Sequence, residues 1–194
     1  MPTATVLSAR GVSIGHTTAW RIGSLCSGYG GLDLAVELVL GGQLAWYAET
    51  DRHASTVLAH HWPGIPNLGD IRTVDWPRVE AVDILTAGFP CQDISNAGKR
   101  VGIAGEHSSV WKHVATAVRV LRPRLLFVEN VAALLRRGLD VVHADLAEIG
   151  YDTSWLCLRA SDIGAAHRRD RLFLLATPTP PEGGGADVAD TLRP

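Results

Sequence analysis

The stretch VDILTAGFPCQ at residues 82–92 decides the fold more than any other part of this 194-residue chain. Its first half is mostly apolar, which is typical of a strand buried on both faces of a parallel sheet. The run breaks at Gly88, and Pro90 restricts the backbone just before Cys91. Since α/β folds bind ligands at the carboxyl ends of their strands, we expect Cys91 to lie in a functional site. The alternative is that Cys91 is a small apolar loop residue.

Short apolar runs alternate with amphipathic stretches from Trp20 onward, as in a parallel sheet with helices on both faces. The expected strands are Arg21–Leu25, Leu44–Ala48, Asp83–Thr86, Leu125–Glu129, Thr153–Leu158 and Arg171–Ala176. The expected helices are Leu32–Leu40, Arg52–His61, Val110–Leu121 and Asp140–Ile149. We predict a leader over residues 1–19, one α/β domain over 20–176, and a proline- and glycine-rich linker or tail over 177–194.

The composition restricts the classes of function. A formal net charge of −2 is not that of a protein that binds nucleic acid through an overall basic surface, so such contacts must be local or come from another segment. The three cysteines, Cys26, Cys91 and Cys157, form neither a CxxC pair nor a disulfide framework, which is typical of a reducing compartment. No apolar run is long enough to span a membrane, and no signal peptide is recognisable. We expect a cytoplasmic protein of prokaryotic or phage type, with no metal site.

A glycine-rich turn, SLCSGYGG at residues 24–31, follows the first expected strand. Glycines let the backbone turn tightly and approach a ligand closely, and the next helix offers free amides at its N-terminus. The spacing is G-x-G-G rather than the G-x-G-x-x-G of dinucleotide-binding proteins, and Asp33 stands at the position of the third glycine. The segment is therefore either a simple tight turn or a cofactor-binding loop. Its candidate cofactor contacts are Ser27, Gly28, Tyr29, Gly30 and Gly31.

Two acidic residues follow further elements of the expected sheet. Glu49 closes the second strand, where an acid in a Rossmann-like half accepts hydrogen bonds from ribose hydroxyls. Asp70 follows a third element and suits an adenine amino group, although either acid alone could be a solvated loop residue. No Walker lysine is present to bind phosphates, so the combination favours S-adenosylmethionine over ATP or NAD as the cofactor. The remaining cofactor-binding candidates are Thr50, Ile71 and Pro90.

Charged residues mark the ends of two later strands. Glu129 closes an apolar run next to Asn130, where an unpaired acid is costly to bury. We expect its strand to lie beside the one that leads to Cys91, so that Glu129 faces the same crevice; the alternative is a helix-capping pair. Arg169 and Arg171 are two residues apart, so on an extended chain their side chains face the same way. Guanidinium groups suit a base carbonyl, a carboxylate or a phosphate, although an isolated basic cluster can also be a solvated face.

Taken in order, the Pro-Cys-Gln loop, the Glu-Asn-Val strand end and the Arg-x-Arg before the last strand resemble the cytosine-C5 DNA methyltransferase family over residues 20–176. The resemblance implies the Rossmann-like fold of S-adenosylmethionine-dependent methyltransferases, with a mostly parallel seven-stranded sheet whose last strand is antiparallel. It implies S-adenosylmethionine as the cofactor. It also implies duplex DNA as the partner, with the target cytosine flipped out of the stack because a stacked base cannot reach these groups.

The resemblance gives each residue of the site a role. Cys91 adds as a thiolate to C6 of the cytosine, Glu129 binds the N3 and amino edge, and Arg171 binds O2 with support from Arg169. Asn130 orients the strand end. C5 then receives the methyl group, and loss of the C5 proton releases Cys91. The resemblance places DNA contacts at Gln92, Ser95, Lys99 and Arg100.

This chain departs from the family pattern at several positions. Cys26 stands where the family usually has Phe, and Ser24 where it often has Asp. Ala166 and His167 replace the usual Pro and Gln before the arginine pair. The family's target-recognition region and its final Asn-containing motif have no match here. We therefore expect target recognition to come from a partner chain or from a further segment.

Two other functions remain open at this point. One is a transfer-RNA cytosine-C5 methyltransferase with the same fold. The other is a non-enzymatic cofactor-binding subunit, or a truncated remnant that needs a partner. The presence of Cys91, Glu129 and Arg171 favours an enzyme.

Overall fold

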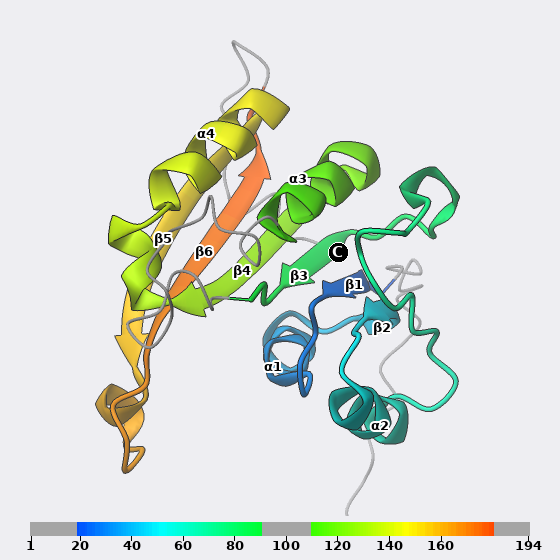
Figure 1. Ribbon diagram of the computed structural model, residues 1–194, viewed down its shortest axis with the longest axis horizontal. Coiled ribbons are helices and arrows are strands. Elements are labelled where there is room, and N and C mark those ends of the chain that lie inside the picture. Colours follow the sequence, from blue (N-terminus) through cyan, green and yellow to red (C-terminus); the bar gives the residue numbers. More distant parts are fainter. Residues whose placement is uncertain (1–18, 91–109, 181–194) are drawn as a thin grey trace, which may run out of the picture.

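The computed structural model describes residues 19–90 and 110–180. Within these ranges the chain forms one mixed sheet with helices on both of its sides (Figure 1). The strands are β1 (Arg21–Leu25), β2 (Gln43–Ala48), β3 (Ile84–Ala87), β4 (Leu125–Val131), β5 (Tyr151–Arg159) and β6 (Asp170–Pro178). The α-helices are α1 (Gly31–Leu40), α2 (Arg52–His61), α3 (Val110–Leu121) and α4 (Leu139–Ile149). Short 3-10 turns occur at Trp76–Arg78, Ala132–Arg136 and Ala160–Ile163.

The strands lie in the order β2-β1-β3-β4-β6-β5. The pairs β1–β2, β1–β3 and β3–β4 are parallel. β6 runs against both of its neighbours, so it begins at the edge of the sheet where β1, β3 and β4 end. This reversal brings the start of β6 to the edge of the sheet where α/β proteins bind ligands.

Two apolar cores cover the two faces of the sheet because neighbouring residues of a strand point to opposite sides. Leu85 and Leu126 pack with α3 and α4 on one face. Ile84 and Leu125 pack with residues of α1 and α2 on the other. The inner strands are buried on both faces, and this explains why β3 reads as an unbroken apolar run.

The sequence-based elements agree closely with the observed ones. β1, α2 and α3 have the predicted bounds, and the other strands and helices differ from the prediction by one or two residues at an end. β6 continues to Pro178, two residues into the segment expected to form the tail. The expected seven-stranded sheet is wrong for the described part of the chain, which contains six strands. The expected antiparallel last strand is confirmed in β6.

No helix in residues 19–90 or 110–180 combines the length and the apolar character that crossing a lipid bilayer requires. In the same residues, no group of three or more His, Cys, Asp or Glu side chains is arranged to hold a metal ion.

Candidate active site

Two cavities lie side by side at the edge of the sheet where β1, β2 and β3 end. The first has a volume of about 470 Å³, and its wall includes the ends of β2 and β3 together with residues 69–72. The second has a volume of about 510 Å³ and is lined by the glycine turn, β4 and the start of β6. Both are lined by Cys26, Gly28 and Gly88, so these three small residues form a shared wall. Volumes of this size suit small-molecule ligands.

The glycine turn shapes this shared wall. Gly28 has a φ of 55°, and a side chain there would have no heavy atom within 4 Å, so its backbone faces open space. Gly30 has a φ of 79°, and a Cβ atom on it would lie 2.6 Å from the Trp62 ring. Ser27, Tyr29 and Gly31 line the second cavity, whereas Gly30 lines neither. The turn is therefore open towards both cavities and closed towards α2.

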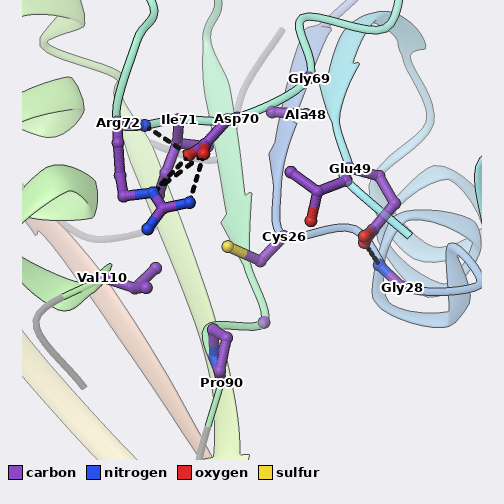
Figure 2. Close-up of a pocket in the computed structure, with 12 residues that line it drawn as sticks. Cys26, Gly28, Ala48, Glu49, Gly69, Asp70, Ile71, Arg72, Pro90 and Val110 are labelled. Carbon is purple, nitrogen blue, oxygen red and sulfur yellow. Dashed lines mark hydrogen bonds and ion pairs between the residues drawn. The ribbon is translucent and has the colours of Figure 1, made fainter. Parts of the chain in front are cut away.

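Glu49 holds the glycine turn against the end of β2. Its Oε2 atom accepts a hydrogen bond of 2.7 Å from the backbone amide of Gly28 (Figure 2). Its Oε1 atom accepts one of 2.7 Å from the backbone amide of Asp51. The Asn67 side chain fixes the Glu49 backbone, because its Oδ1 atom accepts from the Glu49 amide at 3.1 Å. Glu49 lines the first cavity together with its predicted neighbour Thr50. The carboxylate therefore supports the turn and still faces the cavity.

Asp70 lies on the opposite wall of the first cavity, beside the buried Ile71. The sequence analysis missed its partner Arg72, whose guanidinium Nη2 lies 2.5 Å from Asp70 Oδ2 (Figure 2). Hydrogen bonds from Arg72 hold the pKa of Asp70 below its usual range. Any ligand amino group that binds Asp70 must therefore share the carboxylate with Arg72. Pro90 closes this cavity on the β3 side.

Cys26 separates the two cavities. Figure 2 shows its sulfur directed into the first cavity. Burial raises the pKa of the Cys26 thiol to about 12, and the negative charges of Glu49 and Asp70 act in the same direction. The thiol is therefore neutral at physiological pH, and Cys26 is a small apolar residue of the wall.

Glu129 and Arg171 form an ion pair on the wall of the second cavity. The Arg171 Nε atom lies 2.6 Å from Glu129 Oε1, and both side chains are about three-quarters buried. The pair forms because β4 and β6 are antiparallel neighbours whose side chains at these positions point to the same face. Since β3 and β4 pair directly, the predicted proximity of Glu129 to the strand that leads to Cys91 is confirmed.

Arg169 lines the same cavity, but its backbone conformation differs from the predicted one. Its φ of 40° is in the left-handed region, and it precedes the first residue of β6, Asp170. The expectation of an extended chain from Arg169 to Arg171 is therefore wrong. Both arginines nevertheless line the second cavity.

Asn130 connects β4 to the loop after β3. Its buried side-chain amide donates a hydrogen bond of 3.1 Å to the carbonyl oxygen of Phe89, and its Oδ1 atom accepts from the Val131 amide at 2.8 Å. Phe89 stands two residues before Cys91, so Asn130 fixes the start of the segment that carries the thiol. The predicted residues that lie outside the described ranges are Cys91, Gln92, Ser95, Lys99 and Arg100.

A second group of residues that the sequence analysis did not assign lies beneath the glycine turn. Asp33 and Thr86 are both buried to 1% exposure, and both line the second cavity with Ser24. The available signal was an acidic residue in the first turn of a mostly apolar helix. Its hydrogen-bond partner Thr86 is far away in the sequence, so periodicity could not identify the contact.

The fold and the site together define an α/β protein of the Rossmann-like methyltransferase architecture, with two cavities at the carboxyl edge of its sheet. The family model for "C-5 cytosine-specific DNA methylase" matches residues 20–181. The chain therefore belongs to this family.

Individual relatives agree with this assignment. The chain is 33% identical over 163 residues to the type II methyltransferase M.HgiBI of Herpetosiphon aurantiacus, a match that covers 80% of this chain and 37% of the relative. It is 32% identical over 162 residues to M.HhaI of Haemophilus parahaemolyticus, covering 81% of this chain and 49% of the relative. The chain thus spans less than half the length of these two curated relatives.

Solved structures support the fold. The S. pombe Dnmt2 methyltransferase superposes with a TM-score of 0.70 at 19% identity, over 88% of this chain and 54% of that one. A putative DNA modification methyltransferase encoded within a prophage of E. coli gives a TM-score of 0.67 at 22% identity, over 82% and 47%.

Proposed function

We propose that this chain carries the catalytic part of a DNA (cytosine-5-)-methyltransferase, which methylates C5 of a flipped-out cytosine through a covalent bond between Cys91 and C6. The observation that carries the proposal is the Glu129–Arg171 ion pair in the second cavity. It lies beside the glycine turn, and its neighbour Asn130 holds the peptide that leads to Cys91. The matched family is named for the same reaction.

The first cavity fits the nucleoside part of S-adenosylmethionine. Gly28 leaves open space next to the Glu49 carboxylate, and Ile71 and Asp70 supply an apolar surface and an acceptor. Arg72, the basic residue of this wall, is neutralised by Asp70, so the cavity does not select a phosphate. When bound, the cofactor supplies the electrophilic methyl group that the cytosine receives.

The second cavity suits the base because Glu129 and Arg171 lie in direct contact. On cytosine, the amino group, N3 and O2 occupy consecutive positions along one edge, so two adjacent side chains can bind that edge together. Glu129 accepts from the amino group and shares a proton with N3, while Arg171 donates to O2. Arg169, on the same wall, adds positive charge near O2.

The covalent step overcomes the low nucleophilicity of C5. Addition of the Cys91 thiolate to C6 converts the C5–C6 double bond to a single bond and removes the aromaticity of the ring, and the proton shared by Glu129 neutralises the charge that develops at N3. C5 is then nucleophilic enough to accept a methyl group. A base removes the C5 proton, the Sγ–C6 bond breaks, and Cys91 leaves as the thiolate.

Recognition of the DNA target requires contacts beyond the two cavities. Gln92, Ser95, Lys99 and Arg100 are proposed to contact DNA around the flipped nucleotide. We further propose that the target sequence is read by a partner chain or by a further segment, since the chain spans less than half of its curated relatives. A cytoplasmic location stays a prediction.

Covalent trapping tests the reaction. A duplex containing 5-fluorocytosine should form a stable adduct with the wild-type chain in the presence of S-adenosylmethionine, because fluorine blocks the elimination step. Cys91→Ser should abolish the adduct and leave cofactor binding intact. Cys157→Ser is the matched control, because this exposed thiol lies on β5.

The outcomes separate the alternatives. Adducts that persist in the Cys91→Ser protein would contradict the role of the thiol. Trapping on fluorinated transfer RNA but not on DNA would favour the transfer-RNA enzyme. Cofactor binding without an adduct on either nucleic acid would favour the non-enzymatic subunit or a truncated remnant that needs a partner.

A further inference from the structure

We propose that Asp33 makes this site prefer S-adenosylmethionine over its demethylated product, S-adenosylhomocysteine, by presenting a negative charge to the sulfonium group. The inference rests on the proposed function. The two ligands differ by one methyl group and one positive charge. A buried carboxylate near the sulfur is therefore the feature that can distinguish them by charge.

Among the residues that the structure describes, Asp33 is a buried acid without a cationic partner. It lies in the first turn of α1, is 1% exposed and lines the second cavity. Its carboxylate accepts hydrogen bonds from two hydroxyl groups, those of Ser24 at 2.9 Å and of Thr86. None of the ion pairs formed within residues 19–90 and 110–180 includes it. Such a charge is costly unless a cation enters the cavity.

The hydroxyl partners fix the carboxylate in place. Ser24 belongs to β1 and Thr86 to β3, so Asp33 joins α1 to the two central strands. The Ser24 hydroxyl also lies 2.7 Å from the Ser27 hydroxyl of the glycine turn. Since Ser24 has one hydrogen to donate and gives it to Asp33, Ser27 donates to Ser24. The carboxylate therefore cannot leave its place between β1 and β3 without breaking this chain of hydrogen bonds.

The two cavities determine where the sulfonium lies. The nucleoside occupies the first cavity and the cytosine the second, so the transferred methyl group must lie at the wall that they share. Cys26, Gly28 and Gly88 form that wall, and Asp33 lies on its second-cavity side.

The other charged groups around Asp33 do not replace it. Glu129 lines the same cavity but is paired with Arg171. Arg169 also lines it, but its side chain is exposed, so solvent screens its charge. Glu37 lies one turn further along α1, accepts from the Trp62 indole at 3.1 Å and does not line the cavity.

The neighbouring thiol adds no charge near neutral pH. Cys26 is neutral because burial raises its thiol pKa to about 12. Tyr29 also lines the cavity, but its side chain is exposed. Asp33 is therefore the uncompensated buried charge that the described part of the chain places on this side of the cavity.

The preference should depend on pH. Burial raises the pKa of Asp33 to about 6, while hydrogen bonds from Thr86 and Ser24 oppose the rise and the negative charge of Glu37 adds to it. Asp33 is ionised above this pH and neutral below it. The preference for the cationic ligand is therefore present at higher pH and lost as the pH falls through the pKa.

Calorimetric titration of the 194-residue chain with each ligand tests the inference. The measured quantity is the ratio of the two dissociation constants, because a general disturbance of the pocket weakens both ligands and cancels. Asp33→Asn keeps the shape of the side chain and removes the charge. We expect this change to reduce the preference for S-adenosylmethionine about tenfold at about pH 7.5. Glu37→Gln is the matched control, since it removes a carboxylate from the same helix outside the cavity.

A pH series gives a second measurement that needs no variant. The wild-type ratio should fall between about pH 7.5 and pH 5, and the Asp33→Asn ratio should stay constant. A ratio that Asp33→Asn leaves within about twofold of the wild type would overturn the inference. An equal loss of both ligands would show a purely structural role and would also overturn it. If the wild type bound neither ligand, the proposed function would fail and the inference with it.

Discussion

Replacing Glu49 by Ala should weaken the binding of S-adenosylmethionine. The change removes the acceptor for the backbone amides of Gly28 and Asp51, both at 2.7 Å. The bond to Gly28 is partly buried, and leaving its amide unsatisfied costs about 1–3 kcal/mol. The bond to Asp51 is exposed, so water replaces the lost acceptor at little cost. Since Gly28 lines both cavities, we expect most of the loss to appear in ligand affinity, as a reduction of about tenfold to a hundredfold.

Calorimetric titration measures this loss, with urea denaturation to confirm that the variant folds. Glu80→Ala is the control, because Glu80 is an exposed carboxylate that pairs with Arg21 away from the cavities. It should leave the affinity unchanged. Affinity of the Glu49→Ala protein within about twofold of the wild type would refute the reasoning, because the glycine turn would then keep its shape without its acceptor.

Three further predictions follow from buried polar groups and from charge. Asn130→Ala should lower the free energy of unfolding by about 1–3 kcal/mol in urea denaturation, because it leaves the Phe89 carbonyl unsatisfied; an unchanged transition would contradict the role of this contact. The pKa of Asp33 is raised by burial from 3.8 to about 6, so the native state keeps a proton that the unfolded state loses. As the pH rises from about 4 to about 6, the free energy of unfolding of the wild type should therefore fall relative to that of Asp33→Asn, by up to about 3 kcal/mol. Parallel pH profiles of the two proteins would argue against an ionised buried Asp33. With a net charge of −2, the 194-residue chain alone should bind duplex DNA weakly, with strong salt dependence and without a preferred sequence. Footprinting at physiological salt checks this, and a defined protected site would show that a recognition surface is present.

The fold could be predicted from the sequence because its strands are short, apolar and closed by glycine or charged residues. Glu49 directly follows β2 and Glu129 lies two residues before the end of β4, and the rule that ligands bind at carboxyl ends placed both at the correct edge. The order of the strands in the sheet could not be predicted in this way, because it depends on which apolar faces meet. The resemblance to a family, rather than periodicity, supplied the reversed direction of β6.

Contacts between distant segments could not be predicted in the same way. Arg72 pairs with Asp70 through a tight turn, in which the Thr73 amide donates to the Asp70 carbonyl, and hydrophobic periodicity does not register such a turn. The role of Asp33 depends on Thr86, which comes from a different strand. Arg169 illustrates a further limit, because its left-handed backbone is set by the local geometry before β6 and not by residue type.

The reversed direction of β6 has a consequence for rearranging the chain. β1 begins at Arg21 and β6 ends at Pro178, and both points lie at the edge of the sheet opposite the cavities. They are separated by three strand spacings, or about 14 Å. A linker of about five extended residues could therefore join them. New termini could then be opened in a turn at this same edge, such as the one between α1 and β2, which would give a circular permutant with the cavity edge unchanged.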